Sequence, residues 1–186
     1  MGSTNLSYTA LEALRADGPL QTYRDKLMLF GQFIGSWDLD VRFFDPAGDE
    51  IFRGSGEWVF SWVLDGRAFQ DVIIYSDIKD PSKNAPGERR IGSTLRYYDP
   101  SIDLWRLVFL GATSGTFITL TGSSQGTDIL IEGLDMDGSH LRWSFTEITS
   151  NSFHWIGLSS KDNVTWWKEQ EMFAQRRIED IGNKYI

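Results

Sequence analysis

The side chains best suited to acid–base chemistry in this 186-residue chain are one imidazole and two carboxyl groups. His154 is one of only two histidines. A hairpin centred on Ser150-Asn151 would pair it with Glu147. A second hairpin, centred on Asp162-Asn163, would pair it with Glu171. A carboxylate beside an imidazole orients the ring for proton transfer near neutral pH, so the cluster predicts a general acid or base. A surface histidine bonded to a surface glutamate explains the same pattern equally well.

A buried charged pair is expected between Asp71 and Arg96. The turn signal Asp65-Gly66 fixes a pairing in which Asp71 lies opposite Phe60 on an aromatic face. The next hairpin puts Arg96 opposite Leu107, again on a mostly apolar face. A guanidinium holds a carboxylate ionised, which makes Asp71 a poor acid and a weak base. We therefore expect a satisfied ion pair or a group that orients a polar part of a ligand.

The chain is rich in aromatic residues, with 8 Trp, 12 Phe and 6 Tyr beside 18 Gly. This mixture is typical of twisted strands joined by tight turns. The aromatic side chains could line a cavity for a flat apolar ligand or fill a solid core. Because about eight strands already leave room for one small ligand, a larger barrel favours the cavity. The candidate ligand-binding residues are Trp58, Phe60, Trp62, Phe69, Tyr75, Arg96, Tyr98, Trp143, Trp167 and Glu169.

Two helices are expected before the strands begin. Thr9-Ala10-Leu11-Glu12 has the form of a capping box, which predicts a first helix over residues 9–17. Apolar residues at helical spacing between Leu20 and Ile34 predict a second, amphipathic helix that ends at Gly35. This helix is expected to lie across the outside or one end of the remaining fold.

From Ser36 onward the apolar period changes to two, as in a half-buried strand. Turn signals then recur at short intervals, among them Asp45-Pro46-Ala47-Gly48, Asp99-Pro100 and Asp137-Gly138. They predict about ten strands, and closure into an up-and-down antiparallel β-barrel would remove both sheet edges. We expect an all-β single domain over 1–186, with helices in 1–34, the barrel in 35–177 and a tail in 178–186.

The last four strands leave open which face points inward. With the hairpin centres above, one face carries Trp143, Phe145 and Glu147 with Leu130, Glu132, His154, Ile156, Leu158, Trp167, Glu169 and Glu171. The other carries Ile129, Ile131, Phe153, Trp155, Trp166 and Met172 with Arg142 and Lys168. If this second face points outward, it is too apolar for a monomer surface and predicts cover by the helices or a homodimer.

Composition narrows the classes of partner. The 26 acidic and 18 basic residues give a net charge of −8, which disfavours nucleic acid and anionic membranes as partners. There is no Cys, and the two His show no metal-ligand spacing, so neither a metal site nor a cofactor is expected. The first residues lack the basic segment and apolar run of a signal peptide, which predicts a cytoplasmic protein.

Short motifs frame the expected barrel. Gly35-Ser36-Trp37 opens the first strand, and Arg176-Arg177 follows the last one. Between them stand Trp62-Val63-Leu64-Asp65-Gly66-Arg67-Ala68-Phe69, then Gly92 leading to Tyr98-Asp99, then Glu171-Met172-Phe173-Ala174-Gln175-Arg176. This ordered set resembles the lipocalin-like (calycin) superfamily, and within it a bacterial lipocalin-like family of unknown function. The resemblance implies a β-barrel with a central cavity, closed at one end by Trp37 with a late arginine stacked over its ring.

Two functions are consistent with these observations. The first is binding of a small hydrophobic molecule, polyketide- or terpenoid-like, in an aromatic-lined barrel cavity. The alternative is a cofactor-independent cyclase or isomerase acting on such a molecule, with His154, Glu171, Glu147 and Asp71 as candidate catalytic residues. Haem held by His154 is a weaker third hypothesis, because the nearby acidic groups would lie beside the haem propionates.

Overall fold

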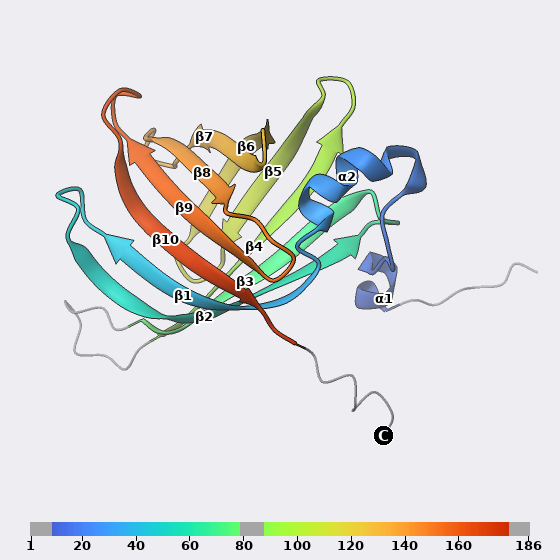
Figure 1. The fold of residues 1–186 in the computed structure, drawn as a ribbon, viewed down its shortest axis with the longest axis horizontal. Helices are drawn as coiled ribbons and strands as arrows, with labels where there is room; N and C mark the ends of the chain where they lie inside the picture. The colour runs from blue at the N-terminus through green and yellow to red at the C-terminus, as the bar shows by residue number, and fades with distance from the viewer. Residues whose placement is uncertain (1–8, 79–87, 179–186) are drawn as a thin grey trace, which may run out of the picture.

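The computed structural model describes residues 9–78 and 88–178, which form a closed barrel of ten antiparallel strands with two short helices (Figure 1). The helical elements are α1 (Ala10–Leu14), the 3-10 turn η1 (Gln21–Tyr23) and α2 (Arg24–Gly31). The strands are β1 (Gly35–Phe44), β2 (Glu50–Val63), β3 (Ala68–Ile78), β4 (Glu88–Asp99), β5 (Leu104–Gly111), β6 (Thr116–Gln125), β7 (Asp128–Leu134), β8 (His140–Thr146), β9 (Ser152–Ser160) and β10 (Trp167–Arg176). The expected fold class is confirmed. The expected tail lies, apart from residue 178, outside the described residues.

Each strand pairs with the next along the chain, and β1 pairs with β10 to close the sheet. Along β1, Trp37, Leu39 and Val41 are buried, whereas Asp38 and Asp40 alternate with them and are more exposed. This alternation gives the sheet one apolar face, which the barrel encloses. Closure also leaves no strand edge of the barrel unpaired.

Two hairpin registers agree with the expectation. Between β2 and β3, Trp58 lies opposite Ile73 and Phe60 lies opposite Asp71. The turn between these strands contains Gly66 at a φ of 71°, a left-handed conformation that suits a hairpin turn. Between β4 and β5, Arg96 lies opposite Leu107, as predicted. The turn residues therefore fixed the correct inward face for both strand pairs.

The expected register of β7 and β8 is wrong by one residue. The Asp135 N–H bonds to the Ser139 carbonyl at 2.8 Å, so the loop holds three residues rather than two, and Gly138 takes a φ of 84°. Trp143 consequently lies opposite Ile131 instead of Glu132. Glu132 therefore lies on the opposite face of the sheet from Trp143, and not on the same face as predicted.

The expected register of β8 and β9 is also wrong by one residue. The turn at Ser150-Asn151 is present, since the Thr149 N–H bonds across it at 2.8 Å. Glu147, however, is an extra residue with a φ of 51° just after β8, which has the effect of a β-bulge. His154 therefore lies opposite Thr146, and the predicted pairing of His154 with Glu147 does not form.

Between β9 and β10 the register differs from the expectation by two residues. His154 lies opposite Phe173, and Glu171 lies opposite Ile156. A shift of two preserves the face, so Glu171 still lies on the same side of the sheet as His154. A further irregularity between Lys168 and Gln170 changes the register at the start of β10.

The burial of side chains shows which face of the last strands points into the barrel. Phe153, Trp155 and Met172 are buried at 3%, 5% and 1% exposure, and they share the barrel interior with Phe145. The ring of Trp143 packs 5.6 Å from that of Trp155. The interior thus combines residues from both predicted faces.

The two helices lie at one end of the barrel, and α2 extends across it (Figure 1). Leu27, Phe30 and Phe33 of this segment are buried at 2% exposure or less. The Phe30 ring meets the Trp105 ring at 4.8 Å, and the Phe33 ring meets the Phe145 ring at the same distance. Phe30 of α2 and Phe33 just after it therefore fill this end of the barrel with aromatic rings.

The α2 end is also held by Trp37 and Arg176. The Trp37 Nε1–H donates to the Phe33 carbonyl at 2.7 Å, and the Arg176 guanidinium lies 4.1 Å from the Trp37 ring centroid. Arg176 also donates to the carbonyls of Gln32 and Ile34 at 2.8 and 2.6 Å. The stacked late arginine implied by the resemblance is present. α1 follows its predicted capping box but ends at Leu14, earlier than expected.

Candidate functional site

An interior pocket of about 80 Å³ lies inside the barrel. Its lining comes from β2, β3, β4, β5, β8, β9 and β10. The lining residues are Trp58, Ile73, Tyr75, Thr94, Arg96, Phe109, Trp143, Trp155, Glu169, Gln170 and Met172. Trp143, Glu169 and Gln170 are only partly buried, so the pocket reaches toward the barrel surface. The cavity is small, because aromatic side chains fill most of the barrel interior.

Two glycines allow the aromatic wall of the pocket to approach the sheet. A Cβ on Gly157 would lie 2.7 Å from the nearest ring atom of Trp155, and a Cβ on Gly92 would lie 2.9 Å from that of Phe109. Both distances are shorter than real Cβ contacts, so the two rings occupy space that any side chain at these positions would take. The glycines therefore set the depth to which Trp155 and Phe109 pack.

The register change at the start of β10 puts both Glu169 and Gln170 into the pocket. Gln170 donates to the Tyr75 hydroxyl at 2.7 Å. Burial raises the pKa of the Tyr75 phenol, and it also raises the pKa of Glu169 to about 6, with smaller contributions from the charges of Asp135 and Asp137. Glu169 is thus a carboxyl group that can exchange its proton near neutral pH.

Asp71 and Arg96 form the expected buried ion pair, with side-chain exposures of 0% and 2%. The Thr94 N–H adds a hydrogen bond to Asp71 Oδ1 at 3.1 Å. The guanidinium also lies 5.2 Å from the Phe30 ring centroid and 5.5 Å from that of Phe69. Both carboxylate oxygens of Asp71 therefore accept hydrogen bonds, one from Thr94 and one from Arg96. Arg96 contacts the Phe30 and Phe69 rings and also lines the pocket.

Three buried N–H groups of pocket residues have no hydrogen-bond partner in the described part of the chain. They are Trp58 Nε1, Trp143 Nε1 and Arg96 Nε. A buried donor without a partner costs about 1–3 kcal/mol relative to one that is bonded. These three nitrogens are buried in the packing around the pocket, whose walls are mainly apolar.

The other predicted ligand-binding residues lie elsewhere. Phe60, Trp62 and Phe69 are buried in the packed half of the barrel and do not line the pocket. Tyr98 donates to Asp103 at 2.6 Å, outside the pocket, and the partly buried Trp167 is likewise not part of its lining. Trp58, Tyr75, Arg96, Trp143 and Glu169 do lie in it.

Sequence reasoning missed several lining residues. Thr94 and Phe109 lie opposite each other in the same register that pairs Arg96 with Leu107, so their positions follow from that hairpin. Trp155 and Met172 were on a face whose direction was left open. Gln170 enters the pocket only through the irregular register at the start of β10, for which the sequence gave no clear signal.

His154 and Glu171 do come together, but on the outer side of the barrel. His154 Nε2 lies 3.3 Å from Glu171 Oε2, and its ring stacks on Phe173 at 4.1 Å. Lys168 donates to the same carboxylate at 2.8 Å, and Arg42 approaches it at 3.6 Å. Burial is the largest single influence on Glu171 and opposes its ionisation, but the hydrogen bonds and charges of Lys168 and His154 together outweigh it and lower the pKa of the carboxyl. His154, Lys168 and Arg42 thus surround a mostly buried carboxylate on the outer face of the sheet.

Glu147, the third member expected in this cluster, is exposed. It lines a shallow outer groove that also includes His154, Phe173 and Asp38. The sheet separates this groove from the interior pocket, because the His154 side of β9 is the face opposite to Phe153 and Trp155. The predicted catalytic residues thus divide between two sides of the sheet.

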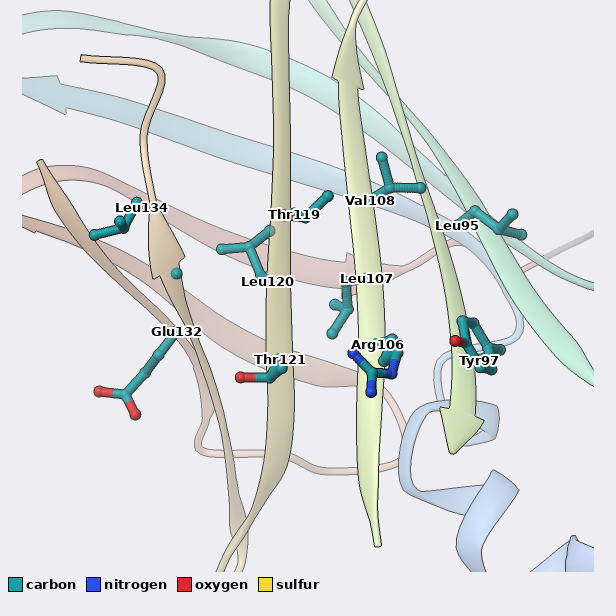
Figure 2. A pocket seen from close by; sticks show the side chains of 11 residues that line it. Leu95, Tyr97, Arg106, Leu107, Val108, Thr119, Leu120, Thr121, Glu132 and Leu134 are labelled. Atoms are coloured by element: carbon teal, nitrogen blue, oxygen red, sulfur yellow. The ribbon is translucent and has the colours of Figure 1, made fainter. Parts of the chain in front are cut away.

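A larger groove of about 670 Å³ lies on the outer face of β4 to β7 (Figure 2). Its outward side chains include Leu95, Tyr97, Val108 and Leu134 (Figure 2). The sequence suggested no role for these four residues. The groove is thus a second concave surface, and ligand binding in the interior pocket has to be distinguished from binding here.

Among residues 9–78 and 88–178, no three His, Cys, Asp or Glu side chains gather as a metal site requires. In the same ranges, none of the helices has the length and apolar character needed to span a membrane.

No protein-family model matches the chain, and no curated protein matches it in sequence. Solved structures do match its fold. The structure of Rv2717c from M. tuberculosis aligns with a TM-score of 0.58 at 15% identity, covering 82% of this chain and 98% of that one. The S-type phycobiliprotein lyase CPES from Guillardia theta aligns with a TM-score of 0.56 at 10% identity, covering 86% and 99%. At these identities the likeness shows the closed β-barrel fold alone.

Proposed function

We propose that the protein binds a small hydrophobic molecule with part of that molecule inside the barrel. The observation that carries this proposal is the interior pocket, whose lining combines aromatic and polar side chains. The aromatic ones are Trp58, Phe109, Trp143 and Trp155, and the polar ones include Arg96, Glu169 and Gln170. Apolar walls with a few placed polar groups are typical of small-molecule sites. The motif order and the Trp37–Arg176 contact further support membership of the lipocalin-like superfamily.

The size of the pocket limits what can enter it. Sites that enclose a whole drug-sized ligand measure roughly 300–1,000 Å³, well above the 80 Å³ seen here. We therefore propose that a ring-sized end of the ligand enters, while the rest extends past the partly exposed Trp143 and Gln170. A polyketide- or terpenoid-like molecule meets this requirement.

Filling the pocket tests the proposal. Ile73 is 5% exposed and lines the pocket, so Ile73→Phe adds ring atoms where the ligand would sit. We expect this variant to lose binding of the ring-sized probe cyclopentanone, measured by NMR titration of the tryptophan indole signals. The matched control is Val108→Phe in the outer groove, which should bind as the unmodified protein does. The opposite pattern would place the site in the outer groove and reject the proposal.

Glu169 supports a second candidate function, the cofactor-independent cyclase or isomerase. A carboxyl group with a pKa of about 6 inside an apolar pocket can donate or accept a proton near neutral pH. In this hypothesis Glu169 takes the role that the sequence suggested for His154, which lies outside the barrel. Given a precursor of the natural ligand, Glu169→Gln should lower kcat by about 10²–10⁴-fold. His154→Ala should leave it unchanged, and an unaffected Glu169→Gln enzyme would exclude the role.

A further inference from the structure

Glu169 alone carries a carboxyl group among the described residues that line the interior pocket. It is partly buried, and it has no hydrogen-bond or ion-pair partner in the described part of the chain. Its oxygens are not enclosed by their neighbours, unlike the indole nitrogens of Trp58 and Trp143. Charges withdrawn from water are normally paired in proteins. Glu169 therefore offers a ligand a carboxylate without a cation of its own.

Arg96, the cation in the pocket lining, does not neutralise Glu169. Its positive charge is matched by Asp71, with which it forms a buried ion pair. After burial, the charges of Asp135 and Asp137 are the further causes that raise the pKa of Glu169, so two more negative groups act on the same carboxyl. A negative field of this kind attracts cations and repels anions.

The aromatic side chains around the pocket also suit a cation. The Trp155 ring packs 6.4 Å from the Trp58 ring and 5.6 Å from the Trp143 ring. The Phe109 ring continues this wall at 5.7 Å from Trp143. The face of an aromatic ring attracts positive charge, most strongly in tryptophan, and groups of such rings bind methylated ammonium ions.

We propose that the part of the ligand that enters the interior pocket carries a positively charged nitrogen, as a methylated amine or a quaternary ammonium group does. The charge pairs with Glu169, and the methyl groups lie against the aromatic wall of Trp58, Phe109, Trp143 and Trp155. This inference rests on the proposed function and names the chemical class of the ligand for the same site.

A pair of probes that differ in one atom tests this inference. Choline and 3,3-dimethylbutan-1-ol have nearly the same shape, but a charged nitrogen in choline replaces a carbon atom of the alcohol. At pH 7.5, above the pKa of about 6 for Glu169, this carboxyl is ionised. We expect choline to bind about tenfold more tightly than the alcohol, from the ion pair and the cation–π contacts together. NMR titration of the tryptophan indole signals measures both affinities.

Two variants identify the groups that recognise the charge. Glu169→Gln keeps the length of the side chain but removes its charge, so it should remove most of the preference for choline. The matched control is Glu132→Gln in the outer groove, which should keep the full preference. Trp143→Leu removes a ring of the aromatic wall and should weaken choline binding by about threefold or more, with a smaller effect on the alcohol.

The outcomes separate the inference from the function on which it rests. Equal binding of both probes, abolished by Ile73→Phe, would overturn the requirement for a positive charge and leave the hydrophobic pocket in place. A choline preference that Glu169→Gln retains would also overturn the inference, since the charge would then be recognised elsewhere. Binding of neither probe, together with no binding of cyclopentanone, would reject the proposed function and the inference together.

Discussion

Glu169 is the residue whose chemistry depends most on its surroundings. Burial, with the nearby charges of Asp135 and Asp137, raises its pKa from the ordinary 4.5 to about 6. As the pH rises, the unfolded chain therefore releases this proton before the folded protein does. Stability is lost as the pH rises from about 4.5 through 6, and the full cost of the buried charge remains above that range.

Glu169→Gln should remove this cost. A pKa difference of about 1.5 corresponds to roughly 2 kcal/mol, so the variant should be more stable by up to that amount at pH 8 and unchanged at pH 4. Urea denaturation at the two pH values measures the difference. The exposed Glu147→Gln is the control, and its effect should be small at both. An equal gain from Glu169→Gln at pH 4 and pH 8 would show that packing, and not charge, is responsible.

At the scale of strands, the aromatic wall depends on the absence of a side chain at Gly157. Trp155 fills the space above this glycine and from there packs 6.4 Å from the Trp58 ring and 5.6 Å from the Trp143 ring. Residues two positions apart on a strand share a face, so Gly157 and Trp155 point into the same interior. A residue with no side chain thereby positions part of the pocket.

Gly157→Ala should displace the Trp155 ring, because the new methyl group would meet it at 2.7 Å. Overpacking of this kind typically costs about 1–3 kcal/mol, which thermal unfolding can measure. Gly18→Ala is the matched control: a Cβ there has no atom within 4 Å, and its effect should stay within about 0.5 kcal/mol. Equal stability of the two variants would mean that Trp155 is not held against the sheet as described.

The same scale explains how far the site could be predicted from the sequence. Asp71 and Arg96 were correctly paired because their hairpins keep a simple register. His154 was misplaced because one extra residue, Glu147, shifts β8 against β9. An inserted residue leaves no strong signal in the sequence unless it is a glycine. Each such irregularity changes which side chains face inward.

At the scale of the whole molecule, the barrel has ten strands as predicted, but its interior pocket measures only about 80 Å³. The alternation of apolar residues and the regular turns were sufficient to predict a closed barrel. Besides the strands, Phe30 of α2 and Phe33, which follows this helix, fill part of the interior. These rings occupy the barrel end at which Trp37 and Arg176 pack, and the remaining space is the small aromatic-lined pocket.

The central claim is that this pocket holds part of a small molecule, and the most direct test is native mass spectrometry of the protein purified from its own host. We expect one bound molecule per chain, which on extraction proves apolar. Ile73→Phe protein prepared in parallel should carry none. The same molecule at equal occupancy in both proteins, or an empty protein in both cases, would contradict the account.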